Sequence, residues 1–249
     1  MSGHSKWSQI KRKKAVLDAK RGAKFTKLIR EITVAARAGG GDPEGNPRLR
    51  LAIDTAKSHN MPLDNIERAV LKGTGDLEGV SYEEATYEGY GPGGAAILVE
   101  VTTDNMNRTV AELRHAFTKH NGNLGAPNSV AWMFDRRGQL YIDAAKYGEE
   151  ATLEAVLEAG AEDMERDGDQ YVVTTNATTL HSVRAHLENA GITPEEAAVA
   201  MIPKSTVRVE GKDAEKLLKL MSLLEDNDDV SQVFSNCDID AETLATAGE

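Results

Sequence analysis

The sequence lacks the features that mark secreted, membrane and disulfide-stabilised proteins. It has a single cysteine, Cys237, and therefore no internal disulfide. Proteins of reducing compartments usually lack disulfides. No apolar run approaches the roughly 20 residues that cross a membrane, and the basic start is not followed by the apolar segment of a secretory signal. We therefore expect a cytoplasmic protein with no membrane partner; an organellar protein whose presequence has been removed would give the same pattern.

Catalytic and metal-binding patterns are also missing. The six histidines and Cys237 show no spacing typical of zinc ligands. The glycines Gly89, Gly91 and Gly94 satisfy G-x-G-x-x-G, but the following residues predict a strand where a dinucleotide site needs a helix. Six carboxylates lie close together in the sequence: Glu149, Glu150, Glu154, Glu158, Glu162 and Asp163. We interpret them as the solvated face and end of a helix in preference to a magnesium site, because carboxylate pairs alone are weak evidence for a metal. We expect no enzyme activity, no cofactor, no metal and no small-molecule substrate.

Acidic residues are absent before Asp18, where cations gather. Up to Gly75 the chain has 16 Lys and Arg against 7 Asp and Glu, a charge of +9, whereas the remainder has 13 against 33, a charge of −20. Such a split predicts a polyanionic partner for the basic end, most often nucleic acid. A run of four cations alone, residues 11–14, would more often be a solvated tail.

The next residues favour phosphate binding over a solvated tail. Residues 15–38 predict an amphipathic helix with an apolar stripe at helical spacing: Phe25, Leu28, Ile29, Ile32 and Ala36. The opposite side is mostly basic, diluted by Glu31: Lys20, Lys24, Lys27, Arg30 and Arg37. A basic ridge behind a cationic arm is typical of a phosphate-tracking surface. The predicted nucleic-acid contacts are Lys6, Trp7, Lys11, Arg12, Lys13, Lys14, Lys20, Arg21, Lys24, Lys27 and Arg30.

Motifs along the chain resemble one known family. The first half carries the series Gly3-His4-Ser5-Lys6-Trp7, Asp18-Ala19-Lys20-Arg21-Gly22, Asn46-Pro47-Arg48-Leu49-Arg50, Asn60-Met61-Pro62, Asp64-Asn65-Ile66-Glu67-Arg68-Ala69 and Tyr87-Glu88-Gly89-Tyr90-Gly91-Pro92. This series resembles the YebC family, which includes the PmpR-type regulators and the mitochondrial translational activator of cytochrome c oxidase. The resemblance covers essentially the whole chain and implies a three-domain architecture.

Hydrophobic periodicity predicts an α+β fold: an N-terminal three-helix domain followed by two α/β sandwich domains, the last ferredoxin-like and inserted into the middle one. Helices are expected to end near residue 59 and span 62–73, with a glycine hinge at 73–75. Residues 139–202 predict the order β-α-β-β-α-β. An incomplete β-α-β unit precedes this stretch, with strands at 95–101 and 130–134 and a helix at 105–119. Residues 207–234 predict two further strands and a helix, which would complete its sheet. We therefore expect domains at residues 1–80, 81–136 with 204–249, and 137–203.

The glycine-rich stretch 87–94 predicts a turn that could carry secondary contacts with nucleic acid. Tyr87 and Tyr90 are candidates to stack on bases, although packing at the edge of a core is the favoured interpretation. Arg108, at the start of a predicted helix, is a third candidate.

Two functions fit this pattern, and a third, an enzyme that acts on phosphorylated substrates, rests only on the acidic clusters. The family role most often assigned is a DNA-binding transcriptional regulator, whereas the mitochondrial member implies a translation factor that binds ribosomal RNA. The predicted helix at residues 63–72 exposes a mixed set of charges, and no recognition helix, zinc finger or zipper is evident. The charge split favours ribosomal RNA, and with it the ribosome as partner, because acidic domains would face solvent while a basic arm enters folded RNA.

Overall fold

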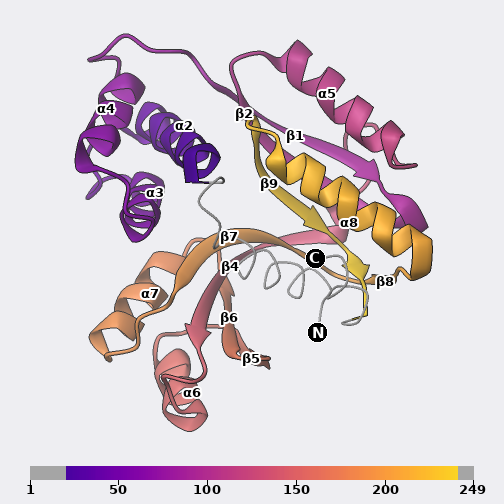
Figure 1. Cartoon of the computed structure of the whole chain (residues 1–249). Helices are drawn as coiled ribbons and strands as arrows, with labels where there is room; N and C mark the ends of the chain where they lie inside the picture. Colours follow the sequence, from indigo (N-terminus) through magenta and orange to yellow (C-terminus); the bar gives the residue numbers. More distant parts are fainter. Residues whose placement is uncertain (1–20, 241–249) are drawn as a thin grey trace. The chain divides into compact units, whose positions relative to one another are not determined.

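The computed structural model describes residues 21–240 of the chain (Figure 1). Within this range, one compact unit ends at Phe134 and resumes at Pro203, and a second spans Asp135–Ile202. Helices come first and sheets follow, so the predicted α+β fold class is confirmed. Among residues 21–240, no helix is both long and apolar enough to cross a membrane.

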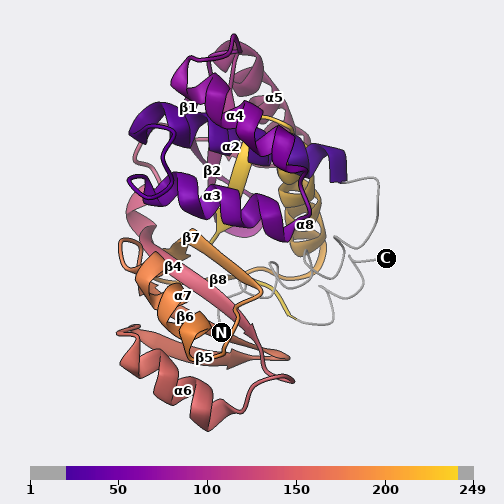
Figure 2. The ribbon, with the colours of Figure 1, turned by 90° about the vertical axis from the view of Figure 1, so that its left-hand side faces the viewer.

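Three helices build the first part of the larger unit: α2 (Arg21–Gly39), α3 (Pro47–Ser58) and α4 (Leu63–Thr74). The carboxamide oxygen of Asn46 accepts the Leu49 amide and so caps α3, with Pro47 in the first turn. The helices pack together in both views (Figures 1 and 2). Their shared core consists of Ile32, Ala35, Ala36, Leu49, Ala52, Ala56, Met61, Ile66 and Ala69.

A glycine sets the closest approach of α2 to α4. A Cβ added at Gly73 would lie 2.6 Å from the Ala36 Cβ and closer still to the Thr33 carbonyl oxygen. The predicted hinge at residues 73–75 is therefore wrong in its first two positions: Gly73 and Thr74 belong to α4, and only Gly75, at φ +89°, ends the helix.

A four-stranded sheet of order β3-β1-β2-β9 forms the second part of the larger unit. Its strands are β1 (Glu83–Tyr90), β2 (Ala96–Thr103), β3 (Asn123–Leu124) and β9 (Val230–Ser235). The antiparallel pairing of β2 with β9 places Val99 opposite Val233, so the carboxyl-terminal segment completes a sheet begun before the insert. The short strands β8 (Val207–Arg208) and β10 (Cys237–Asp238) pair separately and in parallel.

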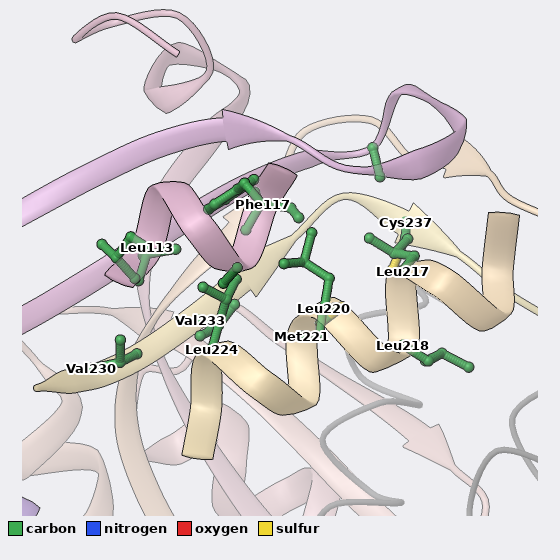
Figure 3. Packing of buried hydrophobic residues seen from close by; sticks show 14 of the residues in the cluster. Leu113, Phe117, Leu217, Leu218, Leu220, Met221, Leu224, Val230, Val233 and Cys237 are labelled. Carbon is green, nitrogen blue, oxygen red and sulfur yellow. The ribbon is translucent and has the colours of Figure 1, made fainter. Parts of the chain in front are cut away.

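The core of this α+β part lies between its sheet and two helices, α5 (Met106–Lys119) and α8 (Gly211–Asp226). Figure 3 shows side chains of α5, α8 and β9 pointing toward one another, among them Phe117, Leu220 and Val233. All three are less than 5% exposed. Burial of this apolar area is the main favourable term that keeps the two separated chain segments together.

Two local predictions in this part are wrong. The stretch 87–94 is not only a turn, because β1 continues through Gly89 to Tyr90 and the turn is the 3₁₀ segment η2 (Pro92–Gly94). The predicted strand 130–134 is instead the 3₁₀ turn η3 (Ala131–Met133). Its amides cannot pair with a strand because the Glu88 carboxylate accepts those of Val130 and Ala131, each at 2.7 Å.

The second unit has the order expected of a ferredoxin-like domain. Its elements are β4 (Phe134–Asp143), α6 (Glu149–Glu158), β5 (Asp163–Asp167), β6 (Gln170–Asn176), α7 (Leu180–Asn189) and β7 (Glu196–Pro203). The sheet order β5-β6-β4-β7 puts the first and third strands of the unit in the centre. Its buried side chains include Leu140, Ile142, Val173, Val183 and Leu187.

Candidate nucleic-acid interface

Most of the predicted nucleic-acid contacts lie outside the described residues: Lys6, Trp7, Lys11, Arg12, Lys13, Lys14 and Lys20. Arg21 is the first residue of α2. Three of the predicted contacts, Lys24, Lys27 and Arg30, follow along α2, and Lys24 is exposed. The other cations on this side of α2, Lys27, Arg30 and Arg37, form hydrogen bonds with the α+β part of the same unit.

Lys27 and Arg37 contact the α+β part of the same unit. The Lys27 ammonium donates a hydrogen bond to the Glu225 carbonyl oxygen at 2.6 Å, near the end of α8. A cation there interacts favourably with the negative end of the helix dipole. The Arg37 guanidinium donates to the Ser81 hydroxyl at 2.7 Å, in the segment that leads to β1. These contacts fix α2 against the sheet-containing part.

Arg30 is enclosed at the end of the sheet, and its side chain is only 12% exposed. Its guanidinium donates to the Asp229 carboxylate at 2.8 Å, to the Asp228 carbonyl oxygen at 2.7 Å and to the Thr102 carbonyl oxygen at 3.1 Å. It also lies over the Tyr82 ring, 5.3 Å from the centroid. In this arrangement Arg30 holds the helices to the sheet, so it is not placed to reach a phosphate.

Asp229 is the centre of this cluster. Besides Arg30, its carboxylate accepts hydrogen bonds from Arg108 at 2.7 Å, Thr109 at 2.7 Å and Thr103 at 3.1 Å. Burial disfavours the charged carboxylate, but these hydrogen bonds outweigh it and lower the pKa of Asp229 from 3.8 to about 2. We call Asp229, Arg30, Arg108, Thr103 and Thr109 the Asp229 cluster.

Arg108, a predicted secondary contact, belongs to the Asp229 cluster. Hydrogen bonds to Asp229 and then to Asp104, at 2.8 Å, raise the pKa of its guanidinium. The sequence gives no signal for this cluster, because Asp229 follows Arg30 by 199 residues and matches no motif. A single sequence shows that a cation lies on the polar face of a helix, and it does not show which distant carboxylate will meet it.

The two candidate tyrosines lie on β1 and are half-buried. Tyr87 packs against the core, and the Tyr90 hydroxyl donates to the Ser129 carbonyl oxygen at 3.0 Å. This placement corresponds to packing at the edge of the core, the interpretation favoured from the sequence over stacking on bases.

The loop between α5 and β4 is organised by a second buried carboxylate. Glu88, on β1, is 7% exposed and accepts the amides of Asn128 at 2.6 Å and of Val130 and Ala131 at 2.7 Å. Burial alone would raise the pKa of Glu88. The three backbone hydrogen bonds together lower it by more than burial raises it, so the pKa lies below its ordinary value. We call residues 121–133 the Glu88 loop.

Two family models together match most of the chain. Residues 5–76 match the family model described as TACO1/YebC protein N-terminal domain, and residues 82–237 match the one described as TACO1/YebC second and third domain. Across residues 21–240, no three His, Cys, Asp or Glu side chains gather as metal ligands would.

Similar proteins from several bacteria carry the name probable transcriptional regulatory protein, which describes a regulator and not an enzyme. One from Geotalea uraniireducens is 59% identical over 98% of both chains, and one from Chlorobium luteolum is 57% identical over 96% of both. A solved structure, a conserved hypothetical protein from Aquifex aeolicus, is 49% identical with a TM-score of 0.85, over 91% of this chain and 93% of that one. The chain belongs to the TACO1/YebC family.

Proposed function

We propose that the protein is a non-enzymatic, cytoplasmic regulator of gene expression that binds nucleic acid through its basic amino-terminal arm. The observation that carries this proposal is the charge split, +9 up to Gly75 and −20 beyond it. The names of the similar bacterial proteins support a regulatory role. Each phosphate neutralised by Lys or Arg releases condensed counterions, and this release drives association without any base reading.

We divide the predicted site residues into two groups by the role that we propose for each. We assign nucleic-acid binding to Lys6, Trp7, Lys11, Arg12, Lys13, Lys14, Lys20, Arg21 and Lys24. Lys27 and Arg30, which bond to the α+β part, orient α2 behind the arm. In this proposal the hydrogen bonds of Lys27 and Arg30 fix the orientation of α2, the helix that follows the arm.

The partner we favour is ribosomal RNA, with the protein acting as a ribosome-associated translation factor. Plain duplex would bring the acidic remainder near phosphates, whereas a cleft in folded RNA admits the arm while acidic surfaces face away. Screening confines this repulsion to about 8 Å at physiological salt, so only acidic groups beside the helices matter. The second candidate is a DNA-binding transcriptional regulator, which the names of the similar proteins favour.

Replacing residues 11–14 with alanine tests arm binding. If all four cations reach phosphates, the slope of log K against log salt on duplex becomes shallower by about 3–4. The matched control replaces four exposed lysines elsewhere, Lys119, Lys146, Lys212 and Lys219, and leaves the slope unchanged. An unchanged slope in the arm variant would show that residues 11–14 do not contact phosphates and form only a solubilising tail.

Two measurements separate ribosome from promoter. Residues 1–75 alone should bind plain duplex DNA more tightly than the full chain does, because the acidic remainder is gone. The full chain should co-sediment with ribosomes in a salt-sensitive way. Tight binding of the full chain to one promoter, undiminished by added ribosomes and without co-sedimentation, would establish the transcriptional role instead.

A further inference from the structure

One of the two tryptophans of the chain lies on the surface of the Glu88 loop. Trp132 is 64% exposed, whereas Phe117 and Tyr171 are at most 2% exposed. Aromatics are only 5% of the sequence, and a tryptophan ring left in water forgoes one of the largest available gains from burial. An indole in this position is a candidate for contact with a ligand.

The indole is held by its edge, which leaves a ring face to solvent. Its Nε1–H donates to the Ser129 carbonyl oxygen at 3.1 Å, and the same oxygen accepts the Tyr90 hydroxyl at 3.0 Å. The polar edge of the ring is therefore satisfied within the protein. A ligand that meets this tryptophan would do so by stacking and not by a hydrogen bond to its nitrogen.

The backbone beneath the ring is fixed by Glu88. That carboxylate accepts the amides of Asn128, Val130 and Ala131, and the Glu88 carbonyl oxygen accepts the amide of Gly125 at 2.7 Å. Asn128 has φ +65°, a left-handed conformation that costs free energy unless its surroundings enforce it. The loop is thus pre-organised, which lowers the entropy lost when a ligand binds.

A cation is attached to the same turn. The Lys204 ammonium donates to the Trp132 carbonyl oxygen at 2.9 Å, and the Lys204 amide donates to the Met133 carbonyl oxygen at 2.9 Å. Lys204 is an exposed residue, and its ammonium is bound to the backbone of the residue that carries the indole. A flat aromatic ring with an adjacent cation is the pair of groups that binds a nucleobase and its phosphate.

We propose that Trp132 is a stacking platform for an unpaired base of single-stranded nucleic acid, with Lys204 beside the phosphate of that nucleotide. This inference rests on the proposed nucleic-acid binding and names the form of nucleic acid that is bound. Base pairs inside a duplex are stacked on both faces and cannot offer one to the ring; only the pairs at its two ends have an open face. A protein partner is less well matched, because a stable interface needs about 800 Å² on each side, and Trp132 is the one large apolar side chain exposed in residues 121–133.

Fluorescence of the full chain tests this assignment. In the Trp7→Phe variant Trp132 is the one remaining tryptophan, so its emission reports on its own ring. A short oligouridylate should quench it saturably, whereas a fully paired duplex of equal length and an abasic single strand should bind without comparable quenching. Stacking on one base predicts that Trp132→Ala weakens oligouridylate binding by roughly 5- to 150-fold.

Two controls decide whether the ring itself is responsible. Trp132→Phe should retain most of the affinity, and Leu63→Ala, which removes a side chain 60% exposed on α4, should leave it unchanged. Arm-dependent binding without quenching, or equal quenching by duplex, would overturn the inference and leave the proposed function intact. An affinity of Trp132→Phe as low as that of Trp132→Ala would also overturn it. Absence of binding to any nucleic acid would overturn both.

Discussion

Two buried carboxylates in the larger unit are kept ionised by different means. Asp229 is surrounded by two arginines and two threonine hydroxyls, whereas Glu88 accepts three backbone amides and, within residues 21–240, has no cation as a partner. The first joins α2 to the end of the sheet and the second shapes one loop. The comparison shows that a cation in a basic sequence can serve the fold: Arg30 belongs to the ridge predicted to bind phosphate, yet its partner is a carboxylate.

The largest effect is expected at Asp229. Replacing Asp229 with alanine leaves Arg30 enclosed without its carboxylate, and breaking one half of a buried ion pair costs about 3–5 kcal/mol of unfolding free energy. Urea denaturation measures the loss. Asp228→Ala is the matched control, because its side chain is exposed and only its backbone oxygen meets Arg30.

A double-variant cycle sharpens this result. Arg30→Met combined with Asp229→Ala should cost less than the sum of the single changes, because each removes the partner of the other. A loss below about 1 kcal/mol for Asp229→Ala would show that the cluster contributes little and that Arg30 is available for other contacts.

Acid should remove the contribution of Asp229 in a defined range. Its pKa is about 2 in the folded protein and 3.8 ordinarily, so the stabilisation is complete above about pH 3.8 and is lost as the pH falls toward 2. The shift corresponds to roughly 2 kcal/mol. The difference in unfolding free energy between the wild type and Asp229→Asn should therefore shrink as the pH falls from 5 to about 2.5. A difference that stays constant would contradict the assignment.

The sequence predicted the helices better than the contacts between them. Spacing alone found the apolar faces of α4 and α5, whose Ile66 and Leu113 are buried, because amphipathic periodicity is local. Strand β1 was missed because Gly89 resembles a turn residue. Its glycine is needed since a Cβ would lie 2.6 Å from the Phe117 ring and 2.7 Å from the Asn123 carbonyl oxygen. Such close approaches, like the Arg30–Asp229 pair, join residues that no periodicity connects.

A smaller and more local effect is expected at Glu88. Glu88→Gln replaces one acceptor oxygen with an NH₂ group that faces a backbone N–H, which leaves buried polar groups unsatisfied and costs about 1–3 kcal/mol. Amide exchange of Asn128, Val130 and Ala131 should accelerate. Glu83→Gln, an exposed position on the same strand, is the control. Unchanged exchange at all three amides would show that the loop does not depend on this carboxylate.

The smallest effect, close to zero, is expected in the second unit. Both carboxylates lie outside residues 135–202, and the core of that unit, with Leu140 and Val173, is formed by its own strands and helices. Exchange protection of β4 and β6 should therefore be the same in the wild type, Asp229→Ala and Glu88→Gln. We further expect residues 137–203 to fold as an isolated fragment. Residues 82–134 should not, because they lack β9 and α8, which supply much of their core. Loss of protection in β4 and β6 together with the Asp229 cluster would show one cooperative unit and overturn the proposed domain boundaries.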